Sequence, residues 1–117
     1  MIVPRFLDPL VLEEVDATRW RVAAECRYDS AVLGVRLIVP HGYETDLASV
    51  PQWAPRWVGA SVRKAALMHD FVYSYHFGAT RETADLVFLE AMTTLGLPRW
   101  RALVLYTMVR WCGQPHW

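Results

Sequence analysis

The hydrophobic periodicity of this 117-residue chain changes once, and the change falls in a stretch that no single helix or strand can contain. Residues 40–61 are interrupted by residues that break regular structure, namely Pro40, Gly42, Pro51, Pro55 and Gly59. Before this stretch, residues 18–28 alternate apolar and polar side chains with the period of a strand. After it, apolar residues recur with the period of a helix. We therefore expect a sheet first and helices second.

The predicted architecture is a single α+β domain over residues 1–117. A small antiparallel β-meander would occupy residues 1–40, and a long loop rich in proline and tryptophan would occupy residues 41–60. Three helices would fill residues 61–113.

Capping residues divide the helical part of the chain. Ser61 and Thr80 are expected to cap the N-termini of the first two helices. Gly78 and Gly96 would end them, and Pro98 would open the third. The first two helices would then form an antiparallel hairpin.

The composition of the chain excludes several classes of protein. It carries 12 basic and 12 acidic residues, and this balance lacks the basic excess that nucleic-acid binding requires. The longest apolar run, residues 102–109, is far shorter than the roughly 20 residues that span a bilayer. The N-terminal residues carry prolines and charges that a signal peptide lacks. We therefore expect no nucleic-acid partner, no transmembrane segment and no signal peptide.

The two cysteines give little indication of a scaffold. Cys26 and Cys112 lack the spacing typical of zinc thiolates or of a disulfide framework. Two buried free thiols are expected, and a single bridge is the alternative.

Ionisable residues interrupt the apolar runs of the predicted helix hairpin. Asp70 lies eight residues before the centre of the turn and Asp85 seven residues after it. At about 1.5 Å of rise per residue, the two carboxylates reach nearly the same height, and His69 is one residue from that level. Tyr73 follows His69 by one turn on the same face. Arg81 precedes Asp85 by one turn and can pair with it.

Three roles are open for this cluster. A histidine beside a carboxylate can act as an oriented general base, which would make His69, Asp85 and Tyr73 catalytic residues. The same set can hold a divalent cation, calcium or zinc, with Asp70 and a loop carboxylate such as Asp46 as ligands. It can equally be an architectural network of hydrogen bonds that holds two helices and a loop together.

The long loop contributes polar residues of its own. Thr45, Asp46 and Ser49 can fix the loop by hydrogen bonds from side chain to backbone. In a functional site, Asp46 would lie over the helix pair, and Ser49 and Arg81 would support the cluster. No G-x-S-x-G elbow surrounds Ser49, which disfavours a role as nucleophile.

Six tryptophans are many for so small a domain. The third predicted helix carries apolar residues around most of its circumference, more than one buried stripe requires. Because tryptophan is enriched at interfaces, Trp57, Trp100 and Trp111 are candidate contacts with another subunit or protein. The alternative is that these indoles close the core over the sheet.

The helix pair resembles a known active site. "HDFVY" (69–73) followed by "ADLVF" (84–88) is similar to the active-site helices of phospholipases A2, above all the bacterial and parvoviral forms. The resemblance implies that His69 activates a water molecule, that Asp70 binds calcium, and that Asp85 and Tyr73 orient the histidine. The glycine-rich calcium loop of those enzymes has no counterpart before His69.

A second resemblance covers more of the chain. The motifs "TDLASVP" (45–51), "HDFVY" and "RETADLVF" (81–88) occur in the order seen in a family of short phage and prophage proteins of unknown function, which the chain resembles. This resemblance implies a setting in virion assembly, envelope penetration or host lysis. It would place the protein in the virion or the host cytoplasm, either self-associated or bound to other phage proteins.

These patterns favour two functions. The first is a virion- or lysis-associated hydrolase that uses His69 and Asp85 on the bacterial envelope, cleaving a lipid ester or a cell-wall bond. The second is a non-catalytic tail or assembly component in which the cluster is architectural. The exposure of His69 discriminates between them, because a base needs an accessible imidazole.

Overall fold

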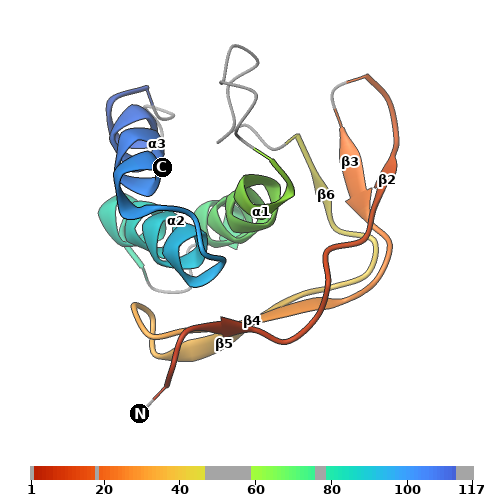
Figure 1. Ribbon diagram of the computed structural model, residues 1–117. Helices are drawn as coiled ribbons and strands as arrows, with labels where there is room; N and C mark the ends of the chain where they lie inside the picture. Colours follow the sequence, from red (N-terminus) through yellow and green to blue (C-terminus); the bar gives the residue numbers. More distant parts are fainter. Residues whose placement is uncertain (1, 18, 47–58, 76–78, 113–117) are drawn as a thin grey trace.

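The computed structural model describes residues 2–17, 19–46, 59–75 and 79–112, with the backbone alone at 60, 61 and 112. Within these ranges, short strands come first and helices follow (Figure 1). The strands are β1 Arg5–Phe6, β2 Leu12–Glu14, β3 Trp20–Val22, β4 Cys26–Ser30, β5 Val35–Val39 and β6 Glu44–Thr45. The helices are α1 Ala60–Tyr75, α2 Arg81–Thr94 and α3 Arg99–Cys112. The α+β class predicted from the sequence is confirmed.

The strands form two three-stranded antiparallel sheets, where a single meander was predicted. One sheet has the order β1-β4-β5 and the other β2-β3-β6. The alternating stretch 18–28 does not form one strand, because the chain turns a corner between Val22 and Cys26. The neighbouring segment of the same chain also turns here, at residues 40–42, where Gly42 has a φ of 93°. Figure 1 shows the two sheets as two arms that meet at this corner.

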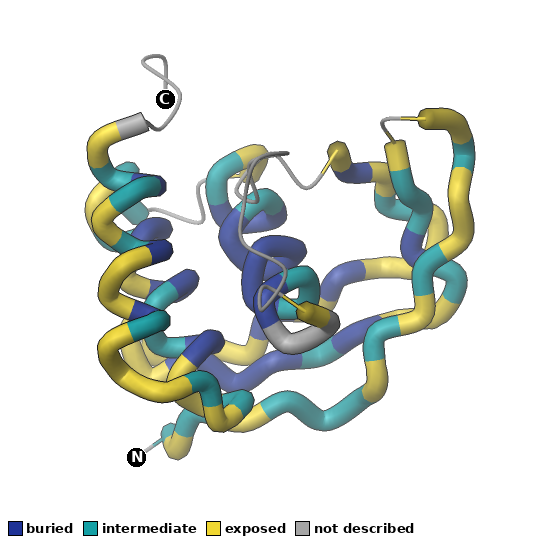
Figure 2. Tube along the Cα trace, turned by 45° about the horizontal axis from the view of Figure 1, so that its top comes forward, coloured by how far each residue is buried: buried dark blue, intermediate teal, exposed yellow. Residues whose placement is uncertain are grey.

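The core lies between the sheets and the helices, with α1 at its centre. Five consecutive residues of α1, Ala65 to His69, are buried, which requires neighbours on all sides of the helix. These neighbours are α2, with which α1 makes its most extensive contact, and strand β5. Figure 2 shows the buried positions concentrated along α1 and α2. A polar residue in the middle of α1 is therefore buried by its position.

Capping geometry agrees with the sequence at the second and third helices. The hydroxyl of Thr80 accepts a hydrogen bond from the backbone N–H of Thr83 at 3.1 Å. Gly96, with a φ of 90°, follows the C-terminus of α2, and the carbonyl of Pro98 accepts the first bond of α3. The first helix begins at Ala60, so that Gly59 occupies the capping position, two residues before the predicted cap Ser61. Gly78 lies outside the described residues.

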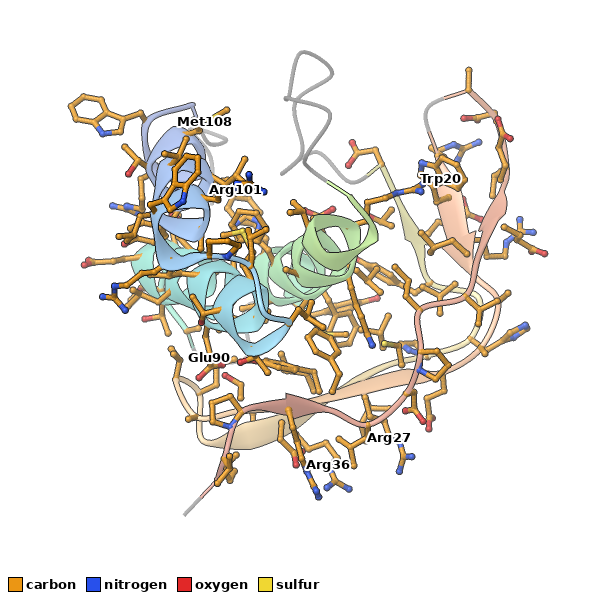
Figure 3. The ribbon with its side chains drawn as sticks, viewed as in Figure 1. Trp20, Arg27, Arg36, Glu90, Arg101 and Met108 are labelled. Atoms are coloured by element: carbon orange, nitrogen blue, oxygen red, sulfur yellow. The ribbon has the colours of Figure 1, made fainter. Side chains whose placement is uncertain are left out.

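The side chain of Glu90 on α2 joins the helices to the sheet (Figure 3). One carboxylate oxygen accepts hydrogen bonds from the hydroxyls of Tyr28 at 2.7 Å and Ser30 at 2.9 Å. The other accepts from the backbone N–H groups of Ala31 at 3.0 Å and Val32 at 2.9 Å. This carboxylate therefore closes the turn that follows β4.

Candidate functional site

Each helix contributes one side chain to a buried polar network. His69 of α1 lies with its Nε2 2.7 Å from Oδ1 of Asp85 on α2. The second oxygen of Asp85, Oδ2, accepts a hydrogen bond of 2.7 Å from Nη1 of Arg110 on α3. We call these three residues the His–Asp–Arg network. Asp85 on α2 is the centre of the network, because it bonds both α1 and α3.

The other ring nitrogen of His69 faces Asp70. Nδ1 lies 3.7 Å from Oδ1 of Asp70, and Oδ2 of Asp70 accepts a hydrogen bond of 2.7 Å from the hydroxyl of Thr45 on β6. The rings of Tyr73 and Phe88 pack against the imidazole, with centroid distances of 5.6 Å and 5.5 Å. The "TDLASVP" and "HDFVY" motifs are thus in direct contact through Thr45 and Asp70.

Burial and charge act in opposite directions on the two central groups. His69 is 5% exposed and Asp85 is 1% exposed. Burial lowers the pKa of His69, but hydrogen bonds and charge from Asp70 and Asp85 outweigh it, so the pKa is raised. Burial raises the pKa of Asp85, but its bonds to His69 and Arg110 outweigh it, so this pKa is lowered. Both shifts favour the charged forms of the two groups.

The structure brings four predicted site residues together: His69, Asp70, Tyr73 and Asp85. The predicted pairing of Arg81 with Asp85 is wrong. The guanidinium of Arg81 instead donates from Nη2 to the backbone carbonyl of Arg110 at 3.2 Å. The guanidinium that reaches Asp85 comes instead from the neighbouring helix, where Arg110 bonds Oδ2 at 2.7 Å, a contact set by helix packing and not by one-turn spacing.

The remaining predicted residues are exposed or lie outside the described ranges. Asp46 follows β6 and its side chain is exposed. Trp100 and Trp111 on α3 are 61% and 84% exposed, so these two indoles do not close the core. Ser49 and Trp57 lie outside the described residues.

Neither a metal centre nor a disulfide is built by the described part of the chain. No group of three histidine, cysteine, aspartate or glutamate side chains is placed there to hold a metal ion. The oxygens of Asp70 face Thr45 and the ring of His69. The calcium or zinc ligands Asp70 and Asp46 therefore stay a prediction. Cys26 is a buried free thiol, and the side chain of Cys112 is not among those described.

Sequence reasoning missed two residues that complete the polar interior, Arg110 and Glu90. Arg110 is the only charged residue in residues 102–115 and follows the apolar run 102–109. Such an isolated charge is a signal that a buried counter-charge lies on a neighbouring element. Glu90 carried no comparable signal, because glutamate is ordinary on a helix surface.

Comparison with known families places the chain in one of them. The family model described as "Protein of unknown function (DUF1353)" matches residues 20–109, and the chain belongs to this family. The matched range contains His69 and Asp85 and ends one residue before Arg110. Comparisons with curated proteins and with solved structures gave no match. No helix among the described residues has the length and apolar character needed to cross a membrane.

Proposed function

We propose that this DUF1353 protein is a non-catalytic tail or assembly component of a phage-like particle, bound to another particle protein through an exposed face of α3. The burial of His69, which is 5% exposed and lies 2.7 Å from Asp85, carries the proposal. A general base must come within hydrogen-bond distance of the proton that it removes. An imidazole enclosed by two carboxylates and two aromatic rings is poorly placed to do so.

The charge state of the network supports an architectural role. The raised pKa of His69 favours the imidazolium, which has no lone pair with which to accept a proton. Together with Arg110, this cation balances the charges of Asp85 and Asp70. Buried ions that are fully paired in this way hold elements in a fixed arrangement. The network would fix α3 relative to α1 and α2.

An exposed apolar strip on α3 supplies the contact surface. It consists of Trp100, Leu103, Val104 and Trp111, which we call the α3 tryptophan face. Positions 100, 104 and 111 fall on one side of a helix. Large exposed apolar groups gathered on one face mark interaction sites, and tryptophan contributes most strongly to binding at such sites. The assignment to a phage-like particle rests on the resemblance of the three sequence motifs, in their order, to those of short phage and prophage proteins.

The hydrolase predicted from the sequence is a second candidate, and one contact favours it. The Asp85 carboxylate bonds one nitrogen of His69, as an orienting carboxylate does in a catalytic pair. In this function the other nitrogen, Nδ1, would act on substrate. It would have to do so beside Asp70, whose oxygen lies 3.7 Å away.

Replacing the whole network by apolar residues separates the two functions. Buried ion networks exchanged for apolar residues of similar size often leave stability unchanged or higher. We expect the triple variant His69→Met, Asp85→Leu, Arg110→Met to fold and to restore particle yield in a strain from which the gene is deleted. Circular dichroism would check the fold, and electron microscopy would count particles. A folded triple variant that forms no functional particles would overturn the architectural role and favour the hydrolase.

The proposed contact surface needs a separate test. The double variant Trp100→Ser, Trp111→Ser should stay folded but fail to enter particles, as measured by immunoblot of purified particles. Ile38→Ser is the matched control, because Ile38 is an exposed apolar residue on β5. Normal incorporation of the tryptophan variant would remove α3 as the contact surface.

A further inference from the structure

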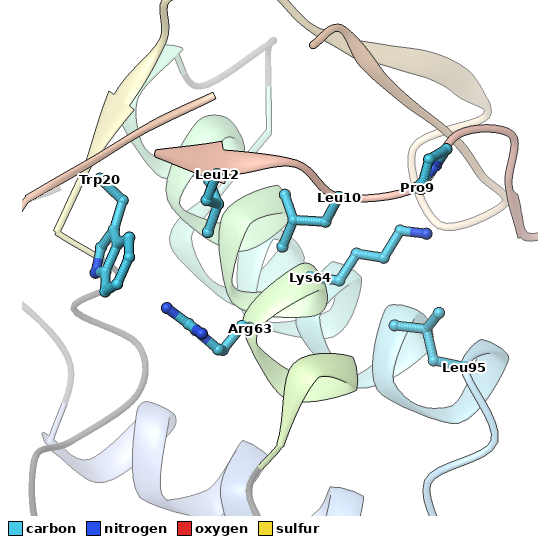
Figure 4. Close-up of a pocket in the computed structure, with 7 residues that line it drawn as sticks. All are labelled: Pro9, Leu10, Leu12, Trp20, Arg63, Lys64 and Leu95. Carbon is cyan, nitrogen blue, oxygen red and sulfur yellow. The ribbon is translucent and has the colours of Figure 1, made fainter. Parts of the chain in front are cut away.

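A pocket lies between the β2–β3 arm and the start of α1, away from the His–Asp–Arg network and the α3 tryptophan face (Figure 4). Its volume is about 430 Å³. Pockets that hold small organic ligands have volumes of about 300–1,000 Å³. The walls combine apolar side chains with an indole and two cations, namely Leu10, Leu12, Leu95, Trp20, Arg63 and Lys64. The residues are thus of the kinds that bind a molecule with an apolar body and a charged group.

The two cations of the pocket differ from the arginines of the sheets. Each arginine of the described strands pairs with a carboxylate, as Arg27 does with Asp8 and Arg36 with Asp29 (Figure 3). Within the described part of the chain, Arg63 and Lys64 have no such ion pair. They are half-buried, so part of their hydration has been lost.

Aromatic rings hold these two cations in place. The guanidinium of Arg63 lies 4.6 Å from the ring centroid of Trp20, and the ammonium of Lys64 lies 4.4 Å from that of Phe6. Such contacts leave N–H groups available to an anion. Asp8, whose charge acts on Lys64, is itself held by three N–H groups of Arg27 at 2.8 to 3.1 Å. The pocket therefore carries positive charge that Asp8, already paired with Arg27, does not neutralise.

The side chains in Figure 4 indicate how a ligand would lie. Arg63 extends toward Trp20, whereas Lys64 extends in the opposite direction toward Pro9. Leu10 and Leu12 lie between Trp20 and Pro9, and Leu95 lies on the side of Lys64. A guanidinium binds carboxylate or phosphate with two parallel hydrogen bonds, which an ammonium cannot do. We propose that the pocket binds an amphiphilic anion, with its carboxylate or phosphate on Arg63 beside Trp20 and its hydrocarbon chain against Leu10, Leu12 and Leu95. This inference does not depend on the function proposed above.

The test compares probes that share a chain and differ in head group. Decanoate and decyl phosphate are titrated into the full chain below their micelle concentrations, beside decyltrimethylammonium and decyl maltoside. Isothermal calorimetry measures affinity, and the NMR signal of the Trp20 indole N–H reports on the site. We expect saturable binding of the two anions, with movement of the Trp20 signal, and much weaker binding of the cationic and neutral probes. Equal affinity for all four probes would overturn the proposal.

Single substitutions locate the head group. Arg63→Gln should weaken binding of decyl phosphate by about tenfold or more, because it removes a charge-assisted contact. Lys64→Gln should weaken it less. Arg99→Gln is the control, since Arg99 is an exposed cation at the start of α3, outside the pocket. Unchanged affinity in Arg63→Gln, or a loss confined to Lys64→Gln, would overturn the assignment.

A variant that fills the pocket distinguishes binding inside it from attraction of the probes to surface charge. Leu10→Trp should abolish binding while both cations remain, and undiminished binding would show that the probes do not enter the pocket. Vesicles of phosphatidylglycerol form a parallel arm. Binding to vesicles that Arg63→Gln weakens identifies a membrane lipid as the source of the anion, whereas binding of the monomeric probes alone identifies a free amphiphile.

Discussion

Two carboxylates on α2, the buried Asp85 and the half-buried Glu90 five positions later, are held by different kinds of partner. Asp85 faces the other helices and is neutralised by two cationic side chains, His69 and Arg110. Glu90 faces the sheet and accepts four hydrogen bonds from neutral donors, two hydroxyls and two backbone N–H groups. One helix thus joins the two halves of the fold by two kinds of interaction.

The difference determines how each junction responds to conditions. An ion pair that includes histidine depends on the protonation of the imidazole, which changes near neutral pH. The donors around Glu90 do not lose their protons in that range. The pKa of Tyr28 is raised far above its ordinary value, mainly by burial and also by the hydrogen bond to Glu90. Near neutral pH the helix junction is therefore sensitive to pH, whereas the junction between helix and sheet is not.

Removal of the centre of the His–Asp–Arg network should have the largest effect on stability. Asp85→Ala leaves the guanidinium of Arg110 without its carboxylate and the buried imidazole of His69 with Asp70 alone. Loss of one partner from a buried pair costs about 3–5 kcal/mol. Chemical denaturation would measure the free energy of unfolding, with Asp16→Asn, which breaks an exposed pair, as the control. A cost below that of Glu90→Gln would contradict the comparison.

Glu90→Gln should have the next largest effect. The amide keeps one acceptor oxygen but turns an NH₂ group toward donors, so that hydroxyl or backbone groups lose their acceptor. Loss of a partner for a buried polar group costs about 1–3 kcal/mol. The same denaturation experiment measures it, and a neutral effect would show that the amide satisfies these groups as well as the carboxylate does.

The pH dependence of stability should distinguish the two junctions. The raised pKa of His69 adds to the free energy of unfolding. This stabilisation is complete below the unfolded pKa of about 6.5 and is lost as pH rises through the folded pKa. The lowered pKa of Asp85 gives a contribution that is complete above about 3.9 and is lost as pH falls through its folded value. The network therefore contributes fully between about pH 3.9 and 6.5.

Difference measurements isolate this effect from the rest of the chain. The free energy of unfolding of the wild type minus that of the apolar triple variant should fall gradually between pH 6 and pH 9. The difference between wild type and Glu90→Gln should stay constant over the same range. A flat profile for both variants would mean that His69 has the same pKa in the folded and unfolded states, and a rising profile would mean that its folded pKa is lowered.

The smallest effect is expected for Arg81. Its contact with the carbonyl of Arg110 is a single hydrogen bond, so Arg81→Ala should cost about 0.5–1.5 kcal/mol. A double-mutant cycle between Arg81 and Asp85 should give little coupling energy, whereas one between Arg110 and Asp85 should give a large one. The reverse pattern would restore the pairing that was predicted from the sequence.

The sequence predicts those parts of the site that depend on one helix hairpin. His69, Asp70 and Asp85 converge because helical rise and a short turn determine their heights. Arg110 could not be assigned to them, since its approach depends on how α3 packs against α2, and no local spacing encodes that arrangement. Arg81 was preferred for its one-turn spacing, although spacing does not show which cation reaches an oxygen first.

The fold shows the same limit. Alternation and the Pro/Gly-rich stretch were enough to predict strands before helices. The corner between Val22 and Cys26 was not predicted, because the alternation of apolar residues continues across it in the sequence. The corner coincides with a turn at Pro40 and Gly42 in the neighbouring segment, which bonds Val22 only in the folded protein.

The bonds of Glu90 also bear on how the chain folds as it is synthesised. Glu90 lies 62 residues after Tyr28 and 60 after Ser30, so the sheet leaves the ribosome well before its carboxylate exists. Small sheets of short strands are marginally stable by themselves. The turn after β4 must therefore remain solvated during translation until α2 follows it. A nascent chain stalled before residue 90 should expose its sheet to proteases, and one stalled after α3 has emerged should not.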